Sequence, residues 1–168
     1  MGTRIVDVRT QVRASWEERV DWALSSAMAA TAARESQAAA RRAMEAGAFD
    51  ELCAHIVHSV APVLEACASK LRAWGVNANV QQTVRDTPVR MPRAMDVSLQ
   101  TDKVDGRGPG TLTLTAVEGR EVLRVVTCVG PGHIGGDYTR ESQVVHAYDL
   151  TTDAVGGLVA GLVERLFA

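Results

Sequence analysis

This chain of 168 residues lacks a long hydrophobic run, a run of like charges and an even set of cysteines. Its longest apolar stretch, residues 155–163, is shorter than the roughly 20 residues that a membrane-spanning helix needs. The N-terminus also has no apolar segment of the kind found in secretory signals. We therefore expect no membrane span and a cytoplasmic location.

The charges nearly balance, with 18 basic and 20 acidic side chains and a formal net charge of −2. A dedicated DNA- or RNA-binding protein has a clustered basic surface, so nucleic acid is not an expected partner. The three cysteines, Cys53, Cys67 and Cys128, are odd in number and lie in apolar stretches. They are expected to be buried thiols in a reducing compartment rather than a disulfide framework.

The hydrophobic pattern of the chain changes at Gly75, from helical spacing before it to the spacing of strands after it. Well before it, Ser15 and Glu18 have the spacing of a capping box, which predicts that a helix starts at Ser15. From residue 23 to 48 the apolar positions of this helix are almost all alanine or methionine. Small side chains bury little area but let a second helix come close, so this helix should need a partner. Its predicted contact stripe consists of Trp16, Val20, Ala23, Ala27, Ala30 and Arg34.

A second helix is predicted to follow a turn at residues 47–50 and to end at Trp74. Gly47 would close the first helix and Asp50 would cap the second, which gives a helical hairpin over residues 15–74. Pro62 is expected to kink the second helix. The apolar seam of that helix consists of Leu52, Ile56, Val60, Val63, Leu64, Cys67, Leu71 and Trp74. Residues 1–14 fit either an extended segment or a helical lead-in.

After Gly75 the hydrophobic period changes to two residues, which is typical of β-strands. Strands are predicted at residues 76–84, 93–101 and 111–117, followed by a tight hairpin at residues 118–119. Residues 121–129 are apolar on both faces and should form a central strand, and a last strand is predicted at residues 142–148. An amphipathic helix should close the chain over residues 152–168, with its glycines, Gly156, Gly157 and Gly161, in close contact with a neighbouring element.

This order of elements predicts a single α+β domain. It consists of a long N-terminal helical hairpin, a four- to five-stranded antiparallel meander over residues 76–149, and a C-terminal helix packed on the sheet. The outward face of the first three strands is rich in Asn, Gln, Thr and Ser. Such a face is either a polar binding surface or the solvated side of an antiparallel sheet.

Residues 130–135 match G-x-G-x-x-G, the fingerprint of dinucleotide-binding folds, through Gly130, Gly132 and Gly135. That fingerprint requires a helix directly after the glycines, because the pyrophosphate binds at the helix N-terminus. Residues 136–143 lack the apolar stripe of such a helix. We therefore predict a glycine-rich hairpin loop that binds no dinucleotide and no other cofactor.

The same loop is nevertheless the best candidate for a ligand site. Cys128, His133 and Asp137 provide a thiol, an imidazole and a carboxylate, which suit a nucleophile with its base or a set of metal ligands. Gly132 and Gly135 complete the set of candidate ligand-binding residues. The simpler interpretation is a core cysteine followed by a solvated loop.

A second cluster of possible metal ligands is formed by Glu51, His55 and His58, at helical spacings of four and three. A metal site inside a helical bundle would require these side chains to face inward. They lie opposite the apolar seam, so an ordinary polar helix face is predicted and no metal site.

Two functions remain. The leading hypothesis is a non-enzymatic assembly or interaction protein that binds itself or another protein through the Ala-rich helix. The alternative is a small-ligand-binding protein or enzyme with a pocket between the sheet and the helices, near residues 130–138. A cavity at that loop with His133 pointing into it would favour the alternative.

Overall fold

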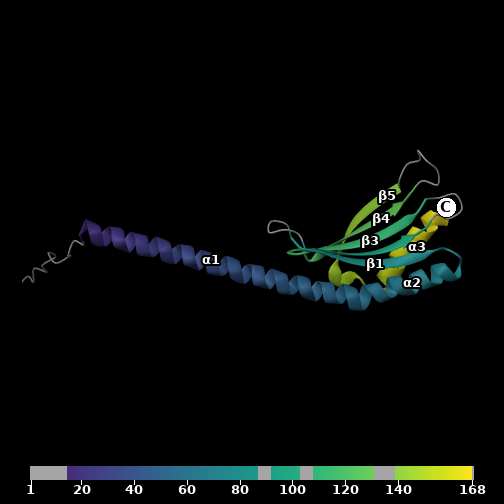
Figure 1. Ribbon diagram of the computed structural model, residues 1–168, viewed down its shortest axis with the longest axis horizontal. Helices are drawn as coiled ribbons and strands as arrows, with labels where there is room; N and C mark the ends of the chain where they lie inside the picture. Colours follow the sequence, from purple (N-terminus) through teal and green to yellow (C-terminus); the bar gives the residue numbers. More distant parts are fainter. Residues whose placement is uncertain (1–14, 87–91, 103–107, 131–138, 168) are drawn as a thin grey trace, which may run out of the picture. The chain divides into compact units, whose positions relative to one another are not determined.

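The computed structural model describes residues 15–86, 92–102, 108–130 and 139–167. The predicted lead-in at residues 1–14 lies outside this range. The chain divides into two units, residues 1–43 and residues 44–168, and helix α1 (Trp16–His55) begins in the first and ends in the second. Figure 1 shows one long helix followed by a five-stranded sheet and a C-terminal helix, so the predicted α+β class is confirmed.

The predicted capping box begins α1. The Ser15 amide donates to Glu18 Oε2 at 2.7 Å, and the Glu18 amide donates to Ser15 Oγ at 3.2 Å. Each side chain thus satisfies a backbone donor that the first helical turn leaves without a partner. From residue 15 to residue 43 every residue of the helix is exposed.

The predicted turn at residues 47–50 is not formed, because α1 is helical through all four positions and no hairpin results. One glycine weakens a helix by about 1 kcal/mol, which its alanine neighbours can outweigh. Asp50, the predicted N-cap, instead forms an ion pair with Arg93. Burial begins here, with Phe49 and Leu52 as the buried residues of α1.

Helix α1 continues into a π-helical turn, η1 (Ile56–Val60), and then into α2 (Ala61–Ala73). The Ala61 amide donates to the Ile56 carbonyl, five residues back. Pro62 has no amide hydrogen for the His58 carbonyl, and the widened turn directly precedes it. The predicted kink at Pro62 stays a prediction. Leu64, Ala68 and Leu71 are buried, whereas Trp74, predicted in the same seam, is 86% exposed.

Gly75 ends α2 with φ of +82°, a conformation that favours glycine. Five strands follow, and each pairs antiparallel with the next in the order β1-β2-β3-β4-β5, which confirms the meander. Gly119, with φ of +77°, forms the predicted turn between β3 and β4. The strands are β1 (Ala78–Arg85), β2 (Ala94–Thr101), β3 (Gly110–Val117), β4 (Val122–Val129) and β5 (Thr139–His146).

One face of the sheet carries the core. Leu99 and Leu112 are opposite each other on β2 and β3, Leu114 is opposite Val125 on β3 and β4, and all four are buried. Helix α2 packs against β1 and β2, and helix α3 (Thr152–Phe167) packs against β3 and β4. Both helices lie on the same side of the sheet in Figure 1. The opposite face, which the helices leave open, holds the alternate residues of each strand.

The two outer strands differ in detail from the predicted ones. The apolar alternation of residues 76–84 includes Val84, yet Val84 is 57% exposed, because burial along β1 ends after Val80. The last strand ends at His146 rather than residue 148, and a short 3₁₀ turn, η2 (Ala147–Asp149), leads into the final helix.

Thr151 caps α3, because its Oγ1 accepts a hydrogen bond from the Ala154 amide at 3.2 Å. The helix is amphipathic as predicted, with Val155, Val159, Leu162 and Leu166 buried. The close contacts expected at its glycines are absent. A Cβ atom built on Gly156, Gly157 or Gly161 would have no atom within 4 Å.

Candidate functional site

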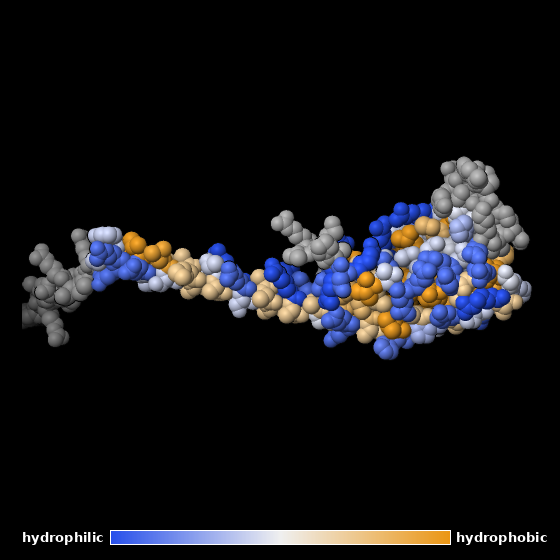
Figure 2. Space-filling model, viewed as in Figure 1, coloured by the Kyte–Doolittle hydropathy of each residue, from blue (hydrophilic) through white to orange (hydrophobic). Residues whose placement is uncertain are grey.

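The N-terminal part of α1, residues 16–43, is the first candidate surface. It contains every residue of the predicted contact stripe, and all of these are exposed, including Trp16 and Val20. Trp22, Leu24 and Met28 are large hydrophobic residues that are also exposed. Figure 2 shows hydrophobic residues on the surface of this segment, interrupted by polar groups.

The second candidate surface is the sheet face without helices. A cavity of about 620 Å³ lies on it, lined by four arginines, one aspartate, two threonines and four valines. We call this the arginine–valine face; it consists of Arg85, Asp96, Thr113, Thr115, Val117, Arg120, Val122, Arg124, Val126, Arg140 and Val144. The sequence contains no motif that indicates these arginines.

A third hollow, of about 490 Å³, lies between α2 and α3 and is almost entirely apolar. Trp74 and Phe167 are on its rim, and both are exposed. Cys67 also lines it, and burial raises the pKa of its thiol above the ordinary range. A buried thiol with a raised pKa is a poor nucleophile, so this groove offers apolar contact rather than reactivity.

Asn77, Asn79, Gln100 and Thr111 line a smaller polar hollow of about 390 Å³ at the opposite end of β1 and β2 from Arg85. The Asn77 amide donates to Asp102 Oδ2 at 2.8 Å. These residues belong to the predicted outward polar face. Apart from Asp102, the residues that line this hollow are uncharged, so they define no specific chemistry.

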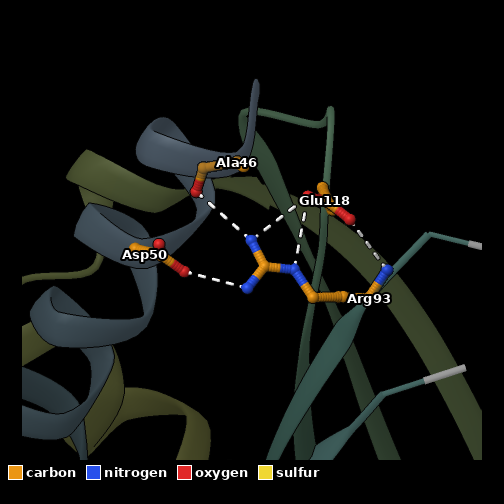
Figure 3. Close-up of polar contacts among 4 residues, drawn as sticks. All are labelled: Ala46, Asp50, Arg93 and Glu118. Atoms are coloured by element: carbon orange, nitrogen blue, oxygen red, sulfur yellow. Dashed lines mark hydrogen bonds and ion pairs between the residues drawn. The ribbon is translucent and has the colours of Figure 1, made fainter. Parts of the chain in front are cut away.

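Arg93 is the centre of a polar cluster that joins α1 to the sheet (Figure 3). Its Nε and Nη2 atoms donate to Glu118 Oε1 at 3.3 and 3.2 Å, and its Nη2 donates to the Ala46 carbonyl at 3.4 Å. Asp50 Oδ1 lies 3.2 Å from Nη1, and the guanidinium stacks over Phe49 with 4.9 Å between the guanidinium carbon and the ring centroid. Each acceptor is already paired, so the cluster holds the helix in place rather than forming an open site.

The same contacts perturb two titrating groups. Hydrogen bonds from the Arg93 amide and guanidinium lower the pKa of Glu118 below its ordinary value. Burial, together with the charge of Asp50, raises the pKa of the Cys53 thiol. Neither shift creates a catalytic acid or base, because Glu118 is fixed in its ion pair and Cys53 is held largely protonated.

The histidines of α1 and η1 do not gather with Glu51. His58 Nδ1 lies 2.7 Å from the Ala54 carbonyl oxygen, and the His55 ring lies 6.0 Å from the Tyr148 ring. Within the part of the chain that the structure describes, no three histidine, cysteine, aspartate or glutamate side chains lie close enough to hold a metal ion.

Among the loop candidates, only Cys128 lies within the described residues. It is on β4, on the outward face, opposite Arg140 of β5, and is partly buried. Gly132, His133, Gly135 and Asp137 lie outside the described ranges, so the alternative site near residues 130–138 stays a prediction.

By length and composition, the continuous helix Trp16–Ala73 is also long and apolar enough to cross a membrane. A third of its most apolar stretch is buried. One such helix is weak evidence for a membrane span, because core helices of soluble proteins and N-terminal signal sequences meet the same criterion. No protein-family model, no curated protein and no solved structure matches this chain. Only its own residues therefore bear on what it does.

Proposed function

We propose that this protein is an assembly protein whose N-terminal helical segment, residues 16–43, pairs antiparallel with the same segment of a second copy. The observation that supports this function most is the complete exposure of a segment that contains Trp16, Val20, Trp22 and Leu24. Helices in water gain most of their stability by packing an apolar face, and among the described residues of its own unit this segment has no such packing.

The distribution of charge favours an antiparallel pair with a second copy. Residues 17–21 contain Glu17, Glu18, Arg19 and Asp21, a formal charge of −2, whereas residues 34–42 contain three arginines and one glutamate, a formal charge of +2. Residues 22–33 between them are uncharged. The helix dipole does not account for the basic group, because α1 continues to His55, more than three turns beyond residue 42.

The contact stripe is also self-complementary in that orientation. A two-fold axis between Met28 and Ala29 places Ala27 of one copy level with Ala30 of the other, and Ala23 level with Arg34. Alanines at the centre let the two backbones approach closely, while the acidic end of each copy lies beside the basic end of the other. A parallel pair would place like charges together.

The length of the segment determines how much surface the helix pair can bury, and therefore how tightly the two copies should bind. Its 28 residues span about 42 Å, and one third of the surface of a rod about 12 Å wide amounts to roughly 500 Å² per copy. The total of roughly 1,000 Å² is at the lower end for specific interfaces. We therefore expect a dimer that dissociates in the micromolar range.

The test is sedimentation velocity of the full chain from about 1 to 100 μM, a range that brackets the expected dissociation constant. Ala27→Glu places a carboxylate in the close contact between the two helices. It should raise the midpoint, the protein concentration at which half of the chains are dimeric, by tenfold or more. Ala32→Glu is the matched control, because it makes the same change on the opposite side of the helix and should leave the midpoint within about twofold. A chain that stays monomeric at 100 μM, or equal effects of both variants, would refute the proposal.

Charge reversal tests the orientation. Glu17→Lys with Asp21→Lys changes the acidic end to +2, and Arg34→Glu with Arg42→Glu changes the basic end to −2. In an antiparallel pair each double variant turns attraction into repulsion and weakens the dimer, and the quadruple variant restores it. A parallel pair keeps like charges together in every variant, so unchanged midpoints would exclude the antiparallel arrangement.

A further inference from the structure

The arginine–valine face has a surplus of positive charge that its own residues do not neutralise. Four arginines line the cavity against one carboxylate, Asp96, which gives a formal charge of +3. Asp96 is fully engaged, since Arg85 Nη2 lies 2.7 Å from its Oδ2 and the Thr115 hydroxyl donates to its Oδ1 at 2.6 Å. The carboxylate therefore neutralises Arg85 alone.

The other three guanidinium groups line the cavity, and none of them has an acidic partner among the described residues. Arg124 Nε donates to the neutral Ser142 hydroxyl at 3.3 Å. Within the described ranges, no ion pair joins Arg120, Arg124 or Arg140 to a carboxylate. Guanidinium groups are planar donors that match carboxylate and phosphate groups in pairs of hydrogen bonds.

Strand register separates these arginines across the face. Arg140 is opposite Cys128 on the neighbouring strand, four residues from Arg124, which corresponds to about 13 Å along the strands. Arg85 lies three strands from Arg124, or about 14 Å across the sheet. A single small anion bound at Arg124 would therefore be too far from Arg140 to pair with it.

Valine side chains fill the space between the arginines. Val126 and Val144 project from β4 and β5 on this face, and Val144 is 66% exposed. Thr113 and Thr115 on β3 add two hydroxyl groups. One exposed and three partly buried valines, with guanidinium groups around them, suit a molecule with an apolar middle and anionic ends. Such a molecule covers the valines and neutralises the arginines together.

From this geometry we propose that the arginine–valine face binds a small organic dianion with an apolar body between its anionic groups. A cavity of about 620 Å³ has the size of a small-molecule site. Arg140 holds one anionic group at the β5 end, and Arg124 holds the other, while the valines contact the body. This site is independent of the helical pairing proposed above.

The experiment is isothermal titration calorimetry of the full chain with three probes: octanedioate, octanoate and inorganic phosphate. Octanedioate carries both features, octanoate lacks the second carboxylate, and phosphate lacks the apolar body. We expect octanedioate to bind at least about tenfold more tightly than either, the effect of one lost charge-assisted contact. Hexanedioate and decanedioate define the preferred length.

Arg140→Gln and Arg124→Gln should each weaken octanedioate binding about tenfold. Arg165→Gln is the matched control, because it removes the same charge from a residue that pairs with Glu141 and does not line the cavity. Thermal unfolding of each variant confirms that the fold is retained. Equal affinity for octanoate and octanedioate, binding of phosphate alone, no binding of any dicarboxylate at millimolar concentration, or equal losses in all three variants would overturn the proposal.

Discussion

A methyl group added at Gly110 should destabilise the folded unit of residues 44–168, whereas the same change in α3 should stabilise it. Gly110 begins β3 and is buried. A Cβ atom at this position would lie 2.9 Å from Leu166 Cδ2, 2.9 Å from Thr101 Oγ1 and 3.1 Å from Leu162 Cδ1. Both leucines are fully buried, so neither can move outward to make room.

The contact also disturbs a hydrogen bond. The Gly110 amide donates to Thr101 Oγ1 at 3.0 Å, and the added methyl group would push this hydroxyl away. Overpacking of this kind costs about 1–3 kcal/mol, and the reduced freedom of the unfolded chain returns about 0.4–1 kcal/mol. We expect Gly110→Ala to lower the free energy of unfolding by about 1–2 kcal/mol, or the melting temperature by roughly 3–6 °C.

Gly161→Ala is the control, because a Cβ atom there meets nothing within 4 Å. Helix propensity alone should then raise stability by about 0.5–1 kcal/mol. Urea unfolding followed by circular dichroism at one fixed, dilute protein concentration measures both variants without a contribution from assembly. Adding Leu166→Val to Gly110→Ala should recover part of the loss, since the smaller side chain frees space. Equal stabilities of the two alanine variants, or a destabilised Gly161→Ala, would refute this reasoning.

Two further predictions concern titrating groups. Hydrogen bonds from Arg93 lower the pKa of Glu118, so its charged form stabilises the fold at neutral pH and this stabilisation is lost as pH falls through the folded-state pKa. Glu118→Gln should therefore have a lower free energy of unfolding than the parent chain at pH 7, and urea titrations should show this difference narrowing below about pH 4.3. A difference that stays constant with pH would contradict the prediction. Burial raises the pKa of Cys53 and Cys67. Iodoacetamide at neutral pH should therefore modify both thiols more slowly in the folded than in the unfolded chain, as measured by peptide mass spectrometry. Equal rates in the two states would show that folding does not protect these thiols.

The parts of the fold that sequence predicted correctly are those that depend on neighbouring residues. Ser15 and Glu18 are three positions apart, so their reciprocal hydrogen bonds follow from local geometry. The turn at Gly119 joins two strands that are adjacent in sequence. Alternation of apolar residues assigned Val97 and Leu99 to the buried face in the same way.

The errors arose where distant residues decide the outcome. Gly47 and Asp50 have the residue types of a turn, yet this region is helical, and Arg93, more than forty positions later, binds the Ala46 carbonyl and the Asp50 carboxylate. Trp74 continues the seam of α2 in sequence, yet it lies past the end of that helix and is exposed. Local periodicity contains no information on either contact.

The arginine–valine face was missed for a related reason. Arg85, Arg120, Arg124 and Arg140 are spread over more than fifty residues and form no run of like charges. Only the pairing of β1 through β5 brings them to one cavity. These arginines could have been found by listing the outward residues of all predicted strands together, in the strand order of the meander, rather than one strand at a time.

The contrast within α1 follows from side-chain volume rather than from helix propensity. Between residues 23 and 43 nearly every apolar side chain is alanine, which gains little free energy by burial against a sheet. From Phe49 onward, leucine, isoleucine and valine recur at spacings of three and four, and burial starts at that residue. Alanine instead permits backbone-to-backbone approach, which only another helix can exploit. If this reasoning is correct, Ala23→Leu with Ala30→Leu should widen the helix spacing and change the strength of self-association, while urea unfolding of residues 44–168 stays unchanged.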